Sequence, residues 1–285
     1  MSLTLTDATP VERHYRPMRR ASGLRVLRCH CHAGVDERPV DEQHEAFSIT
    51  LLERGTLGYR TTAGSAVLSP GWLMLGNPGE AYVCSHEHGD GTGDDCAVLS
   101  MSAQTLDEVC SALGRTGVPP TFNRAGMPPL PRVAALFGGL LDDGDEGFAL
   151  EETALAVVDA VHAALCDGQA PEPAMPQDDR ALAAVNCIEQ RATEPLSLDD
   201  VARCAGVGSF HLVRMFRRSI GVTPHQYLMR VRLLRAISLL RDTARPVTDV
   251  AYDSGWSDLS NFSRTFRREV GCSPNGFRKG GVAGS

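Results

Sequence analysis

Residues 197–221 read SLDDVARCAGVGSFHLVRMFRRSIG and predict two short helices joined by a tight turn. Ser197 is suited to cap the first helix, because its hydroxyl can accept a hydrogen bond from a free backbone N–H. Asp199 and Asp200 follow in the first turn, where the helix dipole favours acidic side chains. Gly206 then supplies the turn, and a second helix follows it. The stretch therefore predicts a helix-turn-helix.

The second helix of this stretch has two faces of different character. Leu212, Phe216 and Ile220 recur every four residues and are expected to pack inward. Another face carries Arg214 and Arg217 and has few acids. Such a face suits a helix that enters the major groove of DNA.

The same pattern returns in residues 246–271, PVTDVAYDSGWSDLSNFSRTFRREVG. DVARCAG matches DVAYDSG at an offset of 49 residues, and VRMFRRSIG matches SRTFRREVG at an offset of 50. Phe262, Phe266 and Val270 are expected to face inward, and a long helix from Pro224 to about Leu240 is expected to join the copies. Two reading helices held this way can reach successive major-groove segments, about 34 Å apart. The alternative, a helical bundle with solvated arginines, does not explain the repeat.

The charge is unevenly distributed along the 285 residues. Residues 1–177 hold 12 arginines and 24 acidic residues, whereas residues 178–285 hold 16 basic and 11 acidic residues. This asymmetry indicates a nucleic-acid-binding module joined to a module of another kind. The length suits about two domains.

The composition points to a cytoplasmic protein. The hydrophobic share of 42% is ordinary for a soluble globular protein. There is no apolar run of ~18 residues, so no membrane partner is expected. The first residues lack a signal-peptide layout, so secretion is not expected. Nine cysteines without regular spacing argue against a disulfide scaffold and favour free thiols.

The first half of the chain is expected to form strands. Residues 22–102 hold short segments separated by glycine, proline and aspartate, many of them rich in β-branched or aromatic residues; they are LRVLRC, AFSITLLE, TLGYRTT, GSAVLS, GWLMLG, EAYVCSH and DCAVLSMS. This spacing predicts an antiparallel sandwich or barrel. The first ~20 residues show no clear pattern and are expected to form a loose arm. Residues 130–166 read as two helices, and the proline-rich stretch 167–179 reads as a linker.

The C-terminal third resembles the DNA-binding domain of the AraC/XylS family of bacterial transcription regulators. The runs SLDDVARCAGVGSFHLVRMFRRSIGVTPHQYLMRVRLLRA and AYDSGWSDLSNFSRTFRREVGCSP carry this resemblance. The segment HEAFSITLLERGTLGYRTTAGSAVLSPGWLMLGNPGEAYVCSH is similar to the cupin-like barrel that often accompanies it, through its ERG, SPG and NPG turns.

The resemblance implies an α+β two-domain protein, in which an N-terminal cupin-like β-barrel with following helices precedes an all-α domain with two helix-turn-helix motifs. The expected parts are a sensory barrel with an N-terminal arm at 1–125, a helical dimerisation segment at 126–168, a linker at 169–179 and the DNA-binding domain at 180–280.

The resemblance also implies which residues contact DNA. The candidates are Ser209, Phe210, Val213, Arg214, Arg217, Arg218, Leu259, Ser260, Ser263, Arg264, Arg267 and Arg268. Among them, Arg217, Arg218, Arg267 and Arg268 are assigned to phosphates, which position a protein without specifying sequence. Val213 departs from the family, which often has a bulky polar residue there, although valine can still touch a thymine methyl.

Residues 84–96, CSHEHGDGTGDDC, form a second candidate site. In an extended strand Cys84, His86 and His88 share one face. Together with Cys96 they are candidate ligands for zinc or another transition metal, and the cupin comparison adds His44 to the set.

In the segment RCHCH, Cys29 and Cys31 share one face and are candidate redox thiols. The structural alternative covers both clusters. A buried free cysteine behaves as a small apolar side chain, and a spacer rich in glycine and aspartate is typical of a hairpin loop.

Taken together, the residues and the resemblance predict a dimeric transcription regulator and not an enzyme. It is expected to bind promoter DNA, to respond to a small-molecule or metal effector in its N-terminal domain, and to contact RNA polymerase if it activates. The alternatives are a metal-dependent cupin enzyme and a thiol redox sensor, each carrying a DNA-binding tail.

Overall fold

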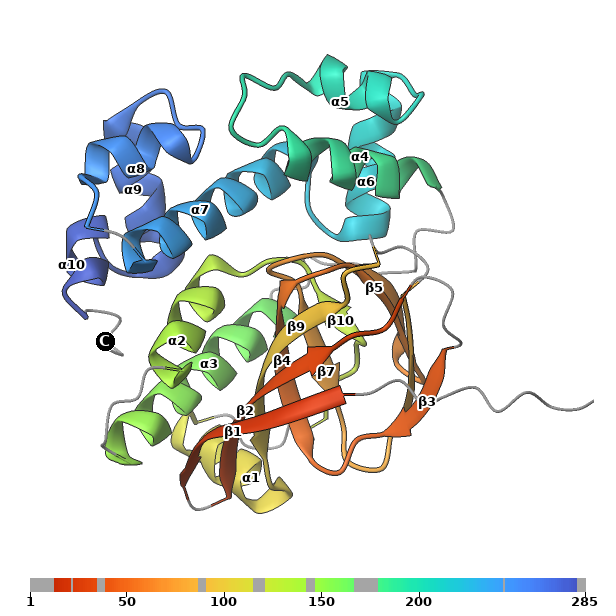
Figure 1. Cartoon of the computed structure of the whole chain (residues 1–285), viewed down its shortest axis with the longest axis vertical. Coiled ribbons are helices and arrows are strands. Elements are labelled where there is room, and N and C mark those ends of the chain that lie inside the picture. The colour runs from red at the N-terminus through yellow and green to blue at the C-terminus, as the bar shows by residue number, and fades with distance from the viewer. Residues whose placement is uncertain are drawn as a thin grey trace, which may run out of the picture.

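The chain has a strand-rich N-terminal part and a helical C-terminal part, as predicted. The computed structural model describes residues 13–21, 23–34, 39–86, 91–114, 121–141, 147–166, 179–242 and 244–280. In Figure 1 the helical part lies along one side of the strand-rich part, with its longest helix spanning between two helical groups.

The described strands form two antiparallel sheets. They are β1 (Arg13–Ala21), β2 (Leu24–Cys31), β3 (Val40–Gln43), β4 (Phe47–Arg54), β5 (Leu57–Thr61), β6 (Gly64–Leu68), β7 (Leu73–Gly76), β8 (Ala81–Ser85), β9 (Asp94–Met101) and β10 (Gly126–Met127). One sheet has the order β1-β2-β9-β4-β7-β10 and the other the order β3-β8-β5-β6. The seven segments expected to form strands do so, because each combines strand-forming residues with turn residues at both ends.

Residues 13–21 form a strand, in contrast to the loose arm expected there. β1 pairs with β2 from Arg13 opposite Cys31 to Ala21 opposite Leu24. Its side chains are mostly exposed or half-buried, so its sequence lacks the alternation that marks a strand with one buried face. Pairing with a neighbour, which a local pattern does not reveal, decides its conformation. Residues 1–12 lie outside the described residues.

The six-stranded sheet has two different faces because side chains alternate along each strand. Its outer face is apolar and packs against α1 (Ala103–Ala112), α2 (Pro131–Leu141) and α3 (Gly147–Cys166); it includes Leu24, Val26, Ile49, Leu99 and Met101. Its inner face, with Cys29, Ser48, Thr50, Cys96 and Ser100, lines a cavity that the four-stranded sheet also borders. The two helices predicted over residues 130–166 are α2 and α3.

The described residues of the C-terminal part form helices joined by turns and short loops. Its helices are α4 (Asp179–Gln190), α5 (Leu198–Cys204), α6 (Ser209–Ile220), α7 (Pro224–Asp242), α8 (Val247–Asp253), α9 (Leu259–Val270) and α10 (Pro274–Arg278). Helices α5 and α6 are the first helix-turn-helix unit, α8 and α9 are the second, and α7 connects the two units (Figure 1). Residues 167–178, most of the predicted linker, lie outside the described residues. Within the described part, none of the helices combines the length and apolarity needed to cross a membrane.

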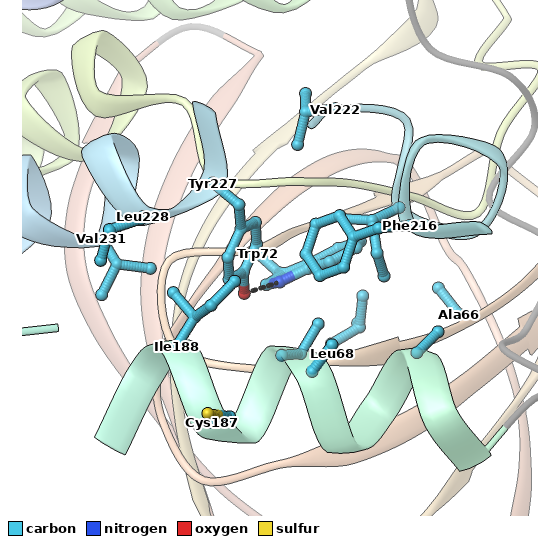
Figure 2. Close-up of a cluster of buried hydrophobic side chains, with 14 of the residues drawn as sticks. Ala66, Leu68, Trp72, Cys187, Ile188, Phe216, Val222, Tyr227, Leu228 and Val231 are labelled. Carbon is cyan, nitrogen blue, oxygen red and sulfur yellow. Dashed lines mark hydrogen bonds between the residues drawn. The ribbon is translucent and has the colours of Figure 1, made fainter. Parts of the chain in front are cut away.

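The first unit shares a hydrophobic cluster with the strand-rich part. Trp72, from the turn before β7, packs beside Tyr227 of α7 and Phe216 of α6 (Figure 2). At the other end of α7, Ala135 of α2 belongs to the core cluster of the second unit, which includes Phe266. The strand-rich part therefore contacts the helical part near both units.

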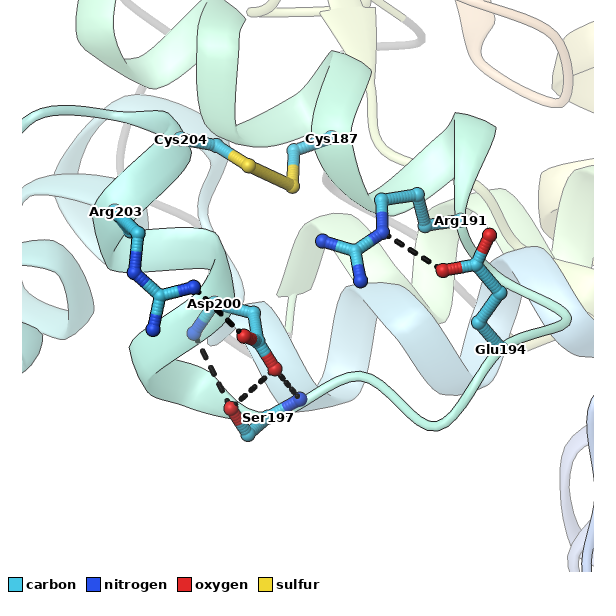
Figure 3. The surroundings of a disulfide bond; sticks show 7 residues. All are labelled: Cys187, Arg191, Glu194, Ser197, Asp200, Arg203 and Cys204. Carbon is cyan, nitrogen blue, oxygen red and sulfur yellow. Dashed lines mark hydrogen bonds and ion pairs between the residues drawn. A yellow bond between two sulfur atoms is a disulfide. The ribbon is translucent and has the colours of Figure 1, made fainter.

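Helix α5 is fixed at both ends (Figure 3). At its start, the Ser197 hydroxyl accepts from the backbone N–H of Asp200, and the Asp200 carboxylate accepts from the backbone N–H of Ser197 at 3.0 Å. This confirms the predicted cap. At its end, Cys204 forms a disulfide with Cys187 of α4, with 6.3 Å between their Cα atoms. The sequence interpretation expected free thiols here; the packing of α5 on α4 brings together two cysteines that lie 17 residues apart.

Candidate nucleic-acid interface and inner cavity

Helices α6 and α9 begin differently but end alike. Gly208 precedes α6 without a side-chain cap, whereas Asp258 caps α9 by accepting from the backbone N–H of Ser260 at 2.9 Å. Each helix ends at a glycine with positive φ, Gly221 at 89° and Gly271 at 96°. Glycine adopts this conformation without the strain of a Cβ atom, so the chain turns sharply after each helix.

The two helices bury and expose the same positions. Each residue of 209–220 has the same degree of burial as the residue fifty positions later in α9. All six side chains predicted to face inward are buried: Leu212, Phe216, Ile220, Phe262, Phe266 and Val270. The inward faces also include Met215 and Thr265, which the sequence reading did not assign. The internal repeat in the sequence therefore corresponds to two helices with the same pattern of burial.

The opposite faces are open to solvent. Phe210 is 96% exposed, so it contributes almost nothing to the core and its apolar ring is available to a partner. The candidates Arg214, Arg217, Arg218, Ser260, Arg264, Arg267 and Arg268 are exposed, and Ser209, Val213, Leu259 and Ser263 are half-buried. Ser209 donates a hydrogen bond to the Asp199 carboxylate, which joins the two helices of the first unit.

The arginines of these faces carry largely uncompensated charge. Among the described residues, Arg214 and Arg264 have no ion pair, whereas Arg268 pairs with Glu269 at 2.9 Å. Arg217 also lines a cavity of about 190 Å³ beside the strand-rich part. Exposed guanidinium groups of this kind suit phosphate oxygens and guanine edges.

Residues 201–280 match the model of a helix-turn-helix domain family. The chain is 38% identical over 94 residues to the regulatory protein SoxS of Salmonella typhimurium, covering 33% of this chain and 88% of SoxS.

The chain belongs to the AraC/XylS family of transcription regulators. This AraC/XylS regulator is also 40% identical over 93 residues to the transcriptional activator RhaS of Escherichia coli, covering 33% of this chain and 34% of RhaS. A longer match, 24% identical over 234 residues, is to the uncharacterised helix-turn-helix regulator YbfI of Bacillus subtilis, covering 80% of this chain and 82% of YbfI. The regulator carries a DNA-binding helix-turn-helix region and is not an enzyme.

A cavity of about 760 Å³ lies between the two sheets of the regulator. Its volume suits a small molecule. Its lining includes the ion pair of Arg13 and Glu42, and Tyr82 donates a hydrogen bond to the same glutamate. The buried thiols Cys29 and Cys84 also line it.

His44 borders the cavity, but both of its ring nitrogens and the ring itself contact neighbouring side chains. Its Nε2 lies 2.6 Å from the Tyr59 hydroxyl, its Nδ1 lies 3.4 Å from the Ser48 hydroxyl, and its ring stacks on Tyr82 at 4.2 Å. Gly76 permits this position, because a Cβ atom there would lie 2.4 Å from the imidazole ring. Burial also lowers the pKa of His44, so the neutral ring is favoured.

Burial favours the protonated form of three thiols that line the cavity. Burial raises the pKa of Cys29 to about 11 and that of Cys84 to about 12, and it raises the pKa of Cys96 well above its usual range. The reactive form of cysteine is the thiolate, so these groups remain largely unreactive thiols at neutral pH. The burial of Cys29 and Cys31 on one face follows the predicted strand alternation, with His32 exposed.

Of the predicted metal ligands that the structure describes, His86 belongs to a group of ligand atoms close enough to share one ion. Its partners in this group are Cys31 and Asp94. Cys84, Cys96 and His44 line the same cavity outside this group, and His88 lies outside the described residues. Asp94 was missed by the sequence reading. Its signal was present, because it lies two residues before Cys96 and therefore shares its strand face.

A half-buried carboxylate, that of Glu189, also lies where the strand-rich part meets the first unit. Tyr227 accepts a hydrogen bond from Trp72 Nε1 at 2.9 Å and donates one to Glu189 Oε1 at 2.6 Å. Burial raises the pKa of Glu189 to about 7, although hydrogen bonds from Tyr227 and Ser69 oppose that shift.

Proposed function

We propose that this regulator binds specific double-stranded promoter DNA as a homodimer and responds to a small-molecule or metal effector in its N-terminal part. In this proposal residues 1–125 form a cupin-like sensory domain, 126–168 the dimerisation segment, 169–179 a linker and 180–280 the DNA-binding domain. The regulator acts in the cytoplasm, and it contacts RNA polymerase if it activates transcription.

The matched exposure of α6 and α9 carries the DNA-binding proposal. Phe210, Arg214 and Arg264 project from reading helices whose opposite faces are buried, so they are free to contact base edges. Arg217 and Arg267 occur one turn further along and suit phosphates. The cavity of about 760 Å³, which holds charged and aromatic side chains, supports effector binding, and the family resemblance supports dimerisation.

Binding to selected DNA tests this proposal. Sites are first selected from a random-sequence DNA library with the full chain, and affinity is then measured by fluorescence anisotropy for Arg214→Ala and Arg264→Ala. Each variant is expected to lose roughly 1–3 kcal/mol of binding free energy and to relax base preference at one position. Arg203→Ala is the matched control, because this exposed arginine lies on α5 and pairs with Asp200. Unchanged affinity and selectivity in both test variants would show that the reading-helix assignment is wrong.

A further inference from the structure

Three buried side chains with metal-ligating atoms meet at the wall of the inner cavity. Cys31 is the last residue of β2, Asp94 is the first residue of β9, and His86 follows β8. They are only 2%, 4% and 5% exposed, respectively. One ligand atom from each, the Cys31 sulfur, an imidazole nitrogen and a carboxylate oxygen, all lie within 4.8 Å of one another.

The fold brings these residues together from both sheets. Antiparallel pairing of β2 with β9 places Cys31 directly opposite Asp94. Gly93 permits this close approach, because a Cβ atom there would lie 2.0 Å from the Cys31 carbonyl oxygen. His86 comes from the other sheet, so the group bridges the two.

Two of the three ligand atoms lie close to the same nitrogen atom. Cys31 Sγ lies 3.6 Å and Asp94 Oδ2 lies 2.9 Å from the same atom, His86 Nε2. That nitrogen carries at most one hydrogen, so it cannot donate well to both neighbours. A cation among the three atoms would satisfy all of them at once.

We propose that Cys31, His86 and Asp94 form a binding site for a divalent transition metal of the zinc class. A donor set of sulfur, nitrogen and oxygen matches zinc, whereas magnesium and calcium prefer oxygen alone. Three protein ligands leave a fourth position open, as in zinc sites that bind water or a small molecule. His86 and Asp94 both line the cavity, so this position faces the space where an effector would bind. The role of this site rests on the proposed function, because the ion would either be the effector itself or bind the effector in the cavity.

Cobalt(II) is the probe for this site. The full chain is stripped of metal with a chelator, kept under a reductant, and titrated with Co²⁺ while its absorption spectrum is recorded. One equivalent is expected to bind and to give a thiolate-to-cobalt charge-transfer band, and Zn²⁺ is expected to displace it. The absence of stoichiometric binding and of this band in the unmutated chain would overturn the site and leave a buried His–Asp ion pair.

Variants assign the ligands. Cys31→Ser is expected to remove the charge-transfer band, and Asp94→Asn to weaken Co²⁺ binding at least tenfold. Cys110→Ser is the matched control, because this buried cysteine lies on α1 outside the group. Retention of the band in Cys31→Ser would overturn the assignment. Circular dichroism identifies any variant that fails to fold, and the result for the unmutated chain then decides.

DNA binding in the same samples separates the two proposals. Stoichiometric metal binding by a chain that does not select any DNA sequence would overturn the proposed function and leave the site intact. Sequence-specific DNA binding by a chain that binds no metal would overturn the site and leave the function intact.

Discussion

The indole N–H of Trp72 donates a hydrogen bond of 2.9 Å to the hydroxyl oxygen of Tyr227. Trp72 lies in the turn before β7, and Tyr227 lies in the first turns of α7, which follows reading helix α6. Met74, two residues after Trp72, lines the inner cavity. A short path of packed and hydrogen-bonded residues therefore joins the cavity to the first helix-turn-helix unit.

Replacement of Trp72 tests the strength of this connection. Trp72→Phe removes the N–H donor and should lower the free energy of unfolding by about 1–2 kcal/mol more than the loss of ring size alone. Trp256→Phe provides the control, because Trp256 is also buried but its Nε1 has no hydrogen-bond partner among the described residues. Urea unfolding measures both variants. Equal costs would show that the hydrogen bond between the two parts adds no stability.

The raised pKa of Glu189 predicts that the stability of the folded protein depends on pH. The pKa of Glu189 is about 7 in the folded protein, compared with 4.5 in an unfolded chain, so the folded state binds the proton more tightly. Its contribution to stability is therefore complete below about pH 4.5 and is lost as the pH rises through about 7, amounting to roughly 3 kcal/mol.

Glu189→Gln isolates this effect, because the amide keeps an acceptor for the Tyr227 hydroxyl and does not titrate. The stability of the unmutated chain minus that of the variant should fall between about pH 5 and about pH 8. Urea unfolding at several pH values measures this difference. A difference that does not change with pH would mean that Glu189 is not buried as a neutral acid.

Phe210 and Phe216 lie on the same helix, but their replacement by alanine should affect stability very differently. Phe210→Ala should leave the free energy of unfolding within ~0.5 kcal/mol of the original and should weaken DNA binding, because the ring lies in solvent. Phe216→Ala should cost about 3–5 kcal/mol of stability, because its ring is fully buried. Chemical unfolding and anisotropy are measured on both. A marked loss of stability in Phe210→Ala would contradict the exposed position of the ring.

The disulfide between Cys187 and Cys204 predicts a thiol count. Seven free thiols should react in the denatured, unreduced chain, and all nine should react after reduction. Because the bond closes a loop across 17 residues, its reduction should lower stability by about 3 kcal/mol. Nine reactive thiols before reduction would show that the bond is absent in solution. Cys110→Ser is a control, since its loss removes one thiol from both counts.

The sequence by itself determined features that depend on neighbours along the chain. The inward faces of α6 and α9 followed from helical periodicity, the cap of α5 from Ser197 and Asp200, and the strands β2 and β4 to β9 from short apolar runs between turn residues. These features are local, because hydrogen bonds and side-chain spacing within one element decide them. The repeat at an offset of 50 residues made the paired reading helices predictable.

Tertiary structure alone decided which distant residues meet. Cys31 and Asp94 become partners through the register of β2 with β9, and His86 joins them from the other sheet. Trp72 reaches Tyr227 only because the sheets pack against α7. A shift of one residue in a strand register would turn these side chains to the opposite face. Such pairings depend on the packing of whole elements, and no local pattern in the sequence encodes that packing.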